Sequence, residues 1–340
     1  MIDYWRIMNK DSFERLTLER VQELLEAQGF AIGLVDPDEY HKWKKVLPNC
    51  VSKSNLMDFA ENPLRYKMNL DAGIEKESAG FKLGSAVDSA LLTPDVFARK
   101  YFYEPKEVQI CADGKPHARG HQSAEQKKRW DERAAKGDVF LKLEELKQVN
   151  DMAGNLAEHM GRLGLRVAAS PDGSAENGGV TCLTQVAMWV QVDVVRGETL
   201  PVTLTVCGML DALPLEDPVL LDVKTTSRGL GEAALNYAMT DYHYGDQAAL
   251  YTDLFQVCTG EPEARRFAFL FVESVYPYQT RMVWVPVLLM EAYRRHYQDA
   301  LIEYARALYT GEWGKLQLPD MDFTPPRYEL NRLGASMLED

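Results

Sequence analysis

The hydrophobic pattern of the chain changes at a polar loop, residues 170–179. Before this loop, apolar residues recur mainly at the spacing of helices. After it, apolar and polar residues alternate, which predicts three strands in close succession and two more further along. The predicted strands cover residues 181–195, 200–214, 218–226, 266–272 and 280–287.

Helices are predicted on both sides of the three successive strands. Gly29 provides a C-terminal stop for the first helix, and Ser52 is an N-cap candidate for a helix that ends before Pro63. The predicted helices cover residues 17–27, 52–62, 80–92, 121–161 with a break near Gly137, 230–238, 244–258 and 288–309. We therefore expect an α/β (α+β) fold with a mixed central sheet flanked by helices.

The domain organisation is expected to be simple. The chain has 340 residues, of which 46% are hydrophobic, and shows no internal repeat, low-complexity tract or evident linker. We expect one domain over residues 46–318, preceded by a helical N-terminal arm, residues 1–45, and followed by a C-terminal tail, residues 319–340.

The compartment is predicted from what the sequence does not contain. No segment reaches the ~18 to 20 uncharged apolar residues of a membrane-spanning helix, and the polar opening lacks the apolar core of a secretory signal. The five cysteines are odd in number, far apart and never arranged as CxxC, which suits a reducing compartment and argues against a zinc or iron–sulfur site. We expect a cytosolic protein, of a bacterium or a phage-infected host, with no membrane partner.

The net charge of the whole chain and the charge of one segment lead to different expectations. The formal net charge of -13 argues against binding nucleic acid, because phosphate contacts need lysine and arginine. Locally, however, residues 115–136 contain seven basic and three acidic residues, which is typical of a solvated helix face but also suits a DNA contact. The candidate DNA-binding residues in this segment are Lys115, Arg119, Lys127, Lys128, Arg129 and Arg133.

The strongest chemical signal is in the segment GMLDALPLEDPVLLDVKTT, which contains Asp211, Asp222 and Lys224. Turn residues at 215–218 predict a hairpin between the two apolar strands. With the turn centred in these four residues, Asp211 and Asp222 lie opposite each other, with Cβ atoms roughly 4.5 to 5.5 Å apart. Lys224 shares the face of Asp222, because strand side chains alternate between faces.

Two opposed carboxylates on a mostly buried hairpin repel each other, so either one is protonated or the pair shares a cation. Magnesium bound by Asp211 and Asp222, with the Val223 carbonyl as a further ligand, would polarise a phosphodiester and lower the pKa of a bound water. Lys224 would orient that water or stabilise the charge developing on phosphorus. A lone DxK pattern has little meaning, but opposed acids on buried strands together with the lysine favour a metal site.

With these motifs the chain resembles the PD-(D/E)xK nucleases and, within them, the phage exonuclease VIII or RecE-like group. The order helix, three-strand meander, helix, strand is that of their restriction-endonuclease-like core. The resemblance spans roughly residues 38–318 and includes FKLGSAVDSALLTPDVF for the first core helix, LLDVKTT for the catalytic strand and GEW for the closing element. It implies that Asp211 and Asp222 are metal ligands and that Lys224 is the catalytic lysine.

The resemblance extends to further residues and shows two departures. Gln247 and Tyr251 match the family's QxxxY element, and share a helix face that either points toward the DNA end or simply caps the sheet. Asp88 stands where the family usually has a histidine metal ligand, and its oxygen suits magnesium. Gln185 stands where the family tends to have glutamate, and an amide binds magnesium less well. These departures leave open a chain that binds DNA ends and cuts them poorly.

The resemblance implies an exodeoxyribonuclease that uses Mg²⁺, or Mn²⁺ in its place, to degrade linear double-stranded DNA from its ends. It further implies 5′ to 3′ polarity, single-stranded tails for a recombination partner that anneals them, and a homo-oligomeric ring. An endonuclease or helicase-associated nuclease of the same fold, and a DNA-end-binding protein without activity, stay open. No Walker loop, HExxH or GxSxG motif supports another chemistry, and His243 is the one histidine of note, just before the QxxxY helix.

Overall fold

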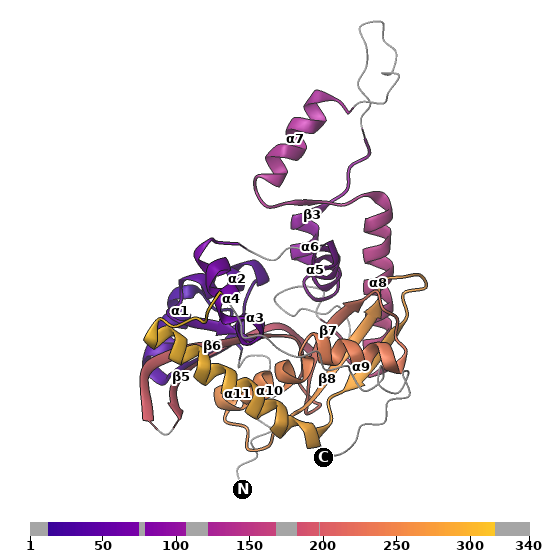
Figure 1. Ribbon diagram of the computed structural model, residues 1–340. Coiled ribbons are helices and arrows are strands. Elements are labelled where there is room, and N and C mark those ends of the chain that lie inside the picture. The colour runs from indigo at the N-terminus through magenta and orange to yellow at the C-terminus, as the bar shows by residue number, and fades with distance from the viewer. Residues whose placement is uncertain (1–12, 75–78, 107–121, 168–181, 197, 317–340) are drawn as a thin grey trace, which may run out of the picture.

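The computed structural model describes residues 13–74, 79–106, 122–167, 182–196 and 198–316. They form a mixed central sheet with helices on both faces (Figure 1), which confirms the expected fold class. Among these residues, no helix is both long enough and apolar enough to cross a membrane.

The N-terminal elements are α1 (Leu18–Gln28), β1 (Phe30–Leu34), α2 (Pro37–Val46), β2 (Cys50–Ser52), α3 (Lys53–Glu61) and α4 (Pro63–Asp71). Thr17 caps α1 by accepting a hydrogen bond from the Arg20 amide at 3.2 Å, and Gly29 ends it with φ 79°. Ser52 is the N-cap of α3, as predicted. The sequence does not predict β1 and β2, and both belong to the central sheet. Residues 30–34 and 50–52 therefore belong to the central sheet.

The next elements are α5 (Ala79–Leu92), α6 (Pro94–Lys100), β3 (Tyr101–Phe102), α7 (Ala124–Ala134), β4 (Val139–Phe140) and α8 (Leu143–Arg162). Strands β3 and β4 pair in parallel and form a small second sheet. The break predicted near Gly137 in the helical stretch over 121–161 is confirmed: Gly137 adopts φ 88° between α7 and α8, and the unpredicted short strand β4 lies within the break.

The remaining strands are β5 (Cys182–Arg196), β6 (Glu198–Pro214), β7 (Val219–Thr226), β8 (Arg266–Glu273) and β9 (Thr280–Trp284). Their order in the central sheet is β1-β5-β6-β7-β8-β9, and β2 pairs in parallel with β6. Strands β5, β6 and β7 form the predicted antiparallel meander, and β7 pairs in parallel with β8.

The last helices are α9 (Glu232–Asp241), α10 (Tyr244–Thr259) and α11 (Val287–Thr310). Helices α3, α10 and α11 pack on one face of the sheet, and α5 and α8 pack on the other. In β8, Phe267 and Phe269 join the first core whereas Ala268 and Leu270 join the second. Burial on both faces explains why β8 is a continuous apolar run in the sequence.

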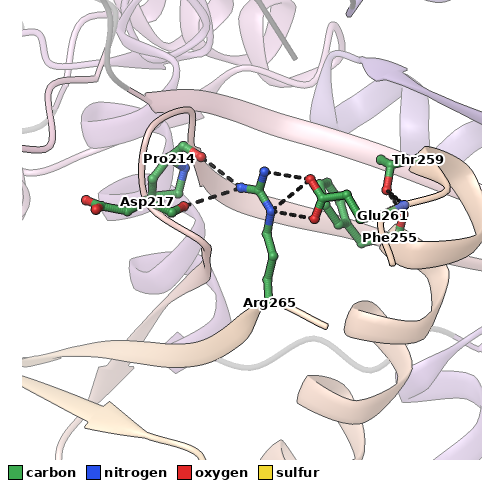
Figure 2. Close-up of polar contacts among 6 residues, drawn as sticks. All are labelled: Pro214, Asp217, Phe255, Thr259, Glu261 and Arg265. Atoms are coloured by element: carbon green, nitrogen blue, oxygen red, sulfur yellow. Dashed lines mark hydrogen bonds and ion pairs between the residues drawn. The ribbon is translucent and has the colours of Figure 1, made fainter. Parts of the chain in front are cut away.

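A buried arginine fixes the turn between β6 and β7 (Figure 2). The Arg265 guanidinium donates to the carbonyls of Pro214 at 3.0 Å and Asp217 at 3.4 Å, and pairs with Glu261 at 2.8 Å. Its central carbon lies 4.9 Å from the centre of the Phe255 ring. Since the Arg265 side chain is only 3% exposed, these contacts are shielded from water. They hold the hairpin that carries the predicted carboxylates.

Candidate active site

Strand β6 changes its partner on one edge. Strand β2 pairs with residues 205–207 of β6, and β7 pairs with the same strand at Ala212, which lies across from Leu221. In an antiparallel ladder, one step forward on one strand is one step back on the other. The Ala212 pair therefore puts Asp211 across from Asp222, which is the register that the sequence predicts.

The two hairpin carboxylates are bound to neighbouring polar groups. Asp211 Oδ2 accepts a hydrogen bond from the Val223 backbone amide at 2.8 Å. Asp222 is 2% exposed, and its Oδ1 forms an ion pair with the Lys224 ammonium. Its Oδ2 accepts a hydrogen bond from the side-chain amide of Gln247 at 2.5 Å. The structure thus brings together these five predicted residues around the middle of β7.

Helix α5 adds a third carboxylate to this place. Asp88 Oδ1 is inaccessible to solvent and has no hydrogen-bond partner among the residues that the structure describes. Burial raises the pKa of Asp88 to about 7, and the Asp222 carboxylate adds to the rise, although the Lys224 ammonium opposes it. An orphaned buried oxygen near two other carboxylates is costly unless a proton or a cation is bound.

The pKa values of the other charged groups in the cluster are shifted by the same causes. Burial, followed by repulsion from Asp222 and Asp88, raises the pKa of Asp211 well above its ordinary value. Burial also raises the pKa of Asp222, although Lys224 and Gln247 stabilise the carboxylate. Burial alone would lower the pKa of Lys224, but attraction to Asp222 outweighs it and the net pKa is raised. The three acidic groups thus outnumber Lys224 and the nearby Lys53, which also stabilises the Asp222 carboxylate, and the cluster favours a further positive charge.

The donor atoms suit a hard divalent cation. All three acidic side chains offer oxygen, the ligand that Mg²⁺ and Mn²⁺ prefer. In the described part of the chain, oxygens of Asp88, Asp211 and Asp222 do not all lie within 4.8 Å of one another. This spacing is compatible with magnesium, which usually keeps several waters and takes one or two carboxylates.

The QxxxY residues lie on the side of α10 that faces the cluster. Gln247 contacts Asp222 directly, as described above. Tyr251 packs on Gly208 of β6, where an added Cβ atom would lie 2.6 Å from the ring carbon Cε1. Burial raises the pKa of Tyr251, and repulsion from Asp222 contributes. Gly208 is therefore required for the close approach of Tyr251 to the sheet.

Sequence reasoning missed a second lysine at this site. Lys53, the first residue of α3, has its ammonium 5.5 Å from the centre of the Tyr244 ring, and the Lys224 ammonium lies 5.2 Å from the same centre. Burial and repulsion from Lys224 lower the pKa of Lys53 to about 8. Lys53 reaches this place because β2 pairs with β6, and no sequence signal indicated that pairing.

Gln185 lies on β5 across from Asp211. Thr184 pairs with Ala212 and Val186 pairs with Leu210, so the ladder is interrupted at Gln185. Its backbone is left-handed, with φ 55°, and its Oε1 is buried without a hydrogen-bond partner within the described residues. A non-glycine residue in this conformation costs roughly 1 to 2 kcal/mol. The amide thus occupies a strained position next to the carboxylates.

The predicted DNA-binding residues that the structure describes lie on α7 and are not brought next to the carboxylates. Lys115 and Arg119 lie outside the described residues. Lys127 and Lys128 are exposed on α7, which stands beyond β3 and away from the central sheet (Figure 1).

Three of these residues have acidic partners, the longest of these ion pairs being that of Lys128 with Glu132 at 3.9 Å. Arg129 pairs with Glu104 at 2.7 Å, and Arg133 pairs with Asp138 at 2.7 Å. Their guanidinium groups therefore stabilise the small second sheet and its helix, and would have to exchange partners to bind phosphate.

Comparison with known proteins gives structural likenesses only. No family model and no curated protein matches the chain. A protein of Eubacterium rectale described as a "Putative exonuclease" is similar over 89% of this chain and 98% of its own, with 14% identity and a TM-score of 0.48. A protein designated SSO0001 is similar over 36% of this chain and 50% of its own, with 16% identity and a TM-score of 0.24. Protein VC1899 of Vibrio cholerae is similar over 88% of this chain and 62% of its own, with 11% identity and a TM-score of 0.20. The RecE-like resemblance thus stays a prediction.

Proposed function

We propose that this chain is a magnesium-dependent deoxyribonuclease that degrades linear double-stranded DNA from its ends. One observation carries the proposal: Asp88, Asp211 and Asp222 gather around Lys224 beside the hairpin, with a buried carboxylate oxygen that has no partner among the described residues. Such a cluster is costly to keep without a cation, so it supports a binding site rather than a structural role.

The roles of the residues follow from their contacts. Asp211 and Asp222 would hold the ion, and Asp88 and the Val223 carbonyl would be further oxygen ligands, either directly or through waters that the ion keeps. Magnesium, or manganese in its place, supplies a Lewis acid and a bound water of lowered pKa. Gln247 orients Asp222 through its hydrogen bond. Lys224, whose pKa is raised, stays protonated and can donate to a phosphate oxygen or to the attacking water.

The finer features of the proposal rest on the resemblance to the exonuclease VIII group. These features are attack from DNA ends, 5′ to 3′ polarity, delivery of single-stranded tails to an annealing protein in recombination, and a ring of several copies. A ring would also let an acidic chain hold DNA, since basic side chains would line the channel while acidic ones face outward.

The test is release of label from an end-labelled linear duplex, with magnesium or with a chelator. We expect release to need both the metal and Asp222, so that Asp222→Ala and Lys224→Ala are inactive. Asp217→Ala is the matched control, because this exposed carboxyl group belongs to the same hairpin but not to the cluster. Equal release by the wild type and Asp222→Ala would defeat the proposal.

A covalently closed circular duplex separates the remaining possibilities. An exonuclease leaves the circle intact and digests the linear form, whereas an endonuclease cuts both. Binding to DNA ends without metal-stimulated cleavage would instead identify a weakened relative, for which Gln185 and Asp88 are the first residues to restore to glutamate and histidine.

A further inference from the structure

A second group of metal-ligating side chains lies at the start of α10. His243 is the N-cap of this helix, Asp246 is in its first turn, and His296 comes from α11. One ligand atom of each residue lies within 4.8 Å of the others, which holds for no other such group among the described residues. The proposed nuclease chemistry uses none of the three.

The geometry of this group centres on one buried carboxylate. The Asp246 side chain is 4% exposed; its Oδ1 lies 2.6 Å from His296 Nδ1 and its Oδ2 lies 3.4 Å from His243 Nδ1. The two imidazole rings stack, with centres 5.9 Å apart and planes at 16°. The histidine side chains are 43% and 53% exposed, so an ion in solution can reach their nitrogens.

The distances are close to those of a zinc site. With bonds of about 2.0 to 2.2 Å, the ligand atoms of a tetrahedral zinc lie roughly 3.3 to 3.5 Å apart. The separation of His243 from Asp246 already has this value, at 3.4 Å. The contact of His296 is a hydrogen bond that has to lengthen by less than about 1 Å, and its exposed side chain can move by that much.

The chemistry of the donors indicates the class of ion. Without an ion, an Nδ1 atom can donate to the carboxylate only if it carries a proton. One divalent cation can replace such protons and satisfy the three side chains together. Two imidazole nitrogens and one oxygen suit zinc and similar ions, whereas magnesium prefers oxygen alone.

We propose that His243, Asp246 and His296 bind a zinc-class divalent cation, with water completing its coordination. The ion would tie the first turn of α10 to α11, directly before Gln247. This site uses no cysteine, so the argument from cysteine spacing against zinc does not reach it. Nor does it depend on the proposed nuclease activity, because its ligands and preferred ion differ.

The experiment is a calorimetric titration of the metal-free, untagged full chain with Zn²⁺ in excess Mg²⁺, which occupies oxygen-only sites. We expect one zinc per chain and a rise of the melting temperature with zinc, since binding to the folded state stabilises it. His296→Ala should weaken binding at least about tenfold, because even groups that only support a ligand cost that much. His159→Ala, which removes a histidine on α8, should leave binding unchanged.

Further variants make the result decisive. Asp246→Asn keeps the size of the buried side chain but removes its charge, and should also lose zinc affinity while its circular dichroism spectrum stays that of the wild type. Absence of saturable zinc binding, binding unchanged in His296→Ala, or binding abolished by Asp222→Ala would each overturn the proposal. The last result would assign the ion to the hairpin carboxylates instead.

Discussion

Replacing Asp88 with asparagine should stabilise the metal-free protein while weakening its response to magnesium. The folded chain raises the pKa of this carboxyl group from 3.8 to about 7, mainly by burial. At 1.36 kcal/mol per pKa unit, the ionised group then destabilises the folded state by about 4 kcal/mol above pH 7. Asparagine has a similar shape and no charge, so Asp88→Asn should recover most of this energy.

The gain in the free energy of unfolding from Asp88→Asn should change with pH in a defined direction. Because the folded state binds the Asp88 proton more tightly than the unfolded state, wild-type stability falls as the pH rises from about 4 to about 7. Below pH 4 the group is protonated in both states, and the advantage of the variant should disappear. Above pH 7 the group is ionised in both states, and the advantage should be constant at up to about 4 kcal/mol.

The measurement is urea unfolding in a chelator at pH 4, 6 and 8, repeated at pH 8 with magnesium. Asp151→Asn is the matched control, because this carboxyl group is exposed on α8 and its loss should change stability by less than about 0.5 kcal/mol. Magnesium should stabilise the wild type more than Asp88→Asn, since the variant lacks one oxygen ligand. A variant that is no more stable at pH 8, or whose gain persists at pH 4, would refute the reasoning.

Two further changes test the support of the site, and a third tests the predicted DNA contact of α7. Gly208→Ala should lower the free energy of unfolding by about 1 to 3 kcal/mol, because the new Cβ meets the Tyr251 ring at 2.6 Å. Gly154→Ala is the control, since there is open space around Gly154 and the change should not destabilise the protein. Urea unfolding of both variants makes the comparison. Arg265→Ala should lower the free energy of unfolding by about 3 to 5 kcal/mol by leaving the largely buried Glu261 carboxylate unpaired, and a loss below about 1 kcal/mol would argue against Arg265 holding the hairpin. Lys127→Ala should reduce the slope of log DNA affinity against log salt concentration by about one, because one phosphate contact is lost. Fluorescence anisotropy between 50 and 200 mM salt measures this slope, and an unchanged slope would argue against α7 as part of the DNA interface.

The long strands could be predicted from the sequence because their signals are local. Alternating residues and a four-residue turn define the β6–β7 hairpin and therefore the register of Asp211 with Asp222. Strands β1 and β2 have five and three residues, and their partners lie more than 150 positions later in the chain. Short segments carry too little periodicity to be recognised, so the edge of the sheet was missed.

The difference between local signals and long-range contacts also applies to the site residues. Asp222 and Lys224 are two positions apart on one strand, so spacing alone relates them, whereas Gln247 on α10 was related to them only by the QxxxY element of the resemblance. Lys53 joins them only through the pairing of β2 with β6, and His296 meets Asp246 only through the packing of α11 on α10. Contacts of this kind depend on tertiary structure, and no pattern within a short window encodes them.

The position of β2 and β7 on one edge of β6 means that the N-terminal segment cannot be trimmed away as an accessory. A chain shortened to begin after residue 52 would uncover the backbone amides and carbonyls of residues 205–207, which β2 now covers. Exposed strand edges of this kind recruit other chains, so such a fragment should aggregate rather than remain a smaller functional unit.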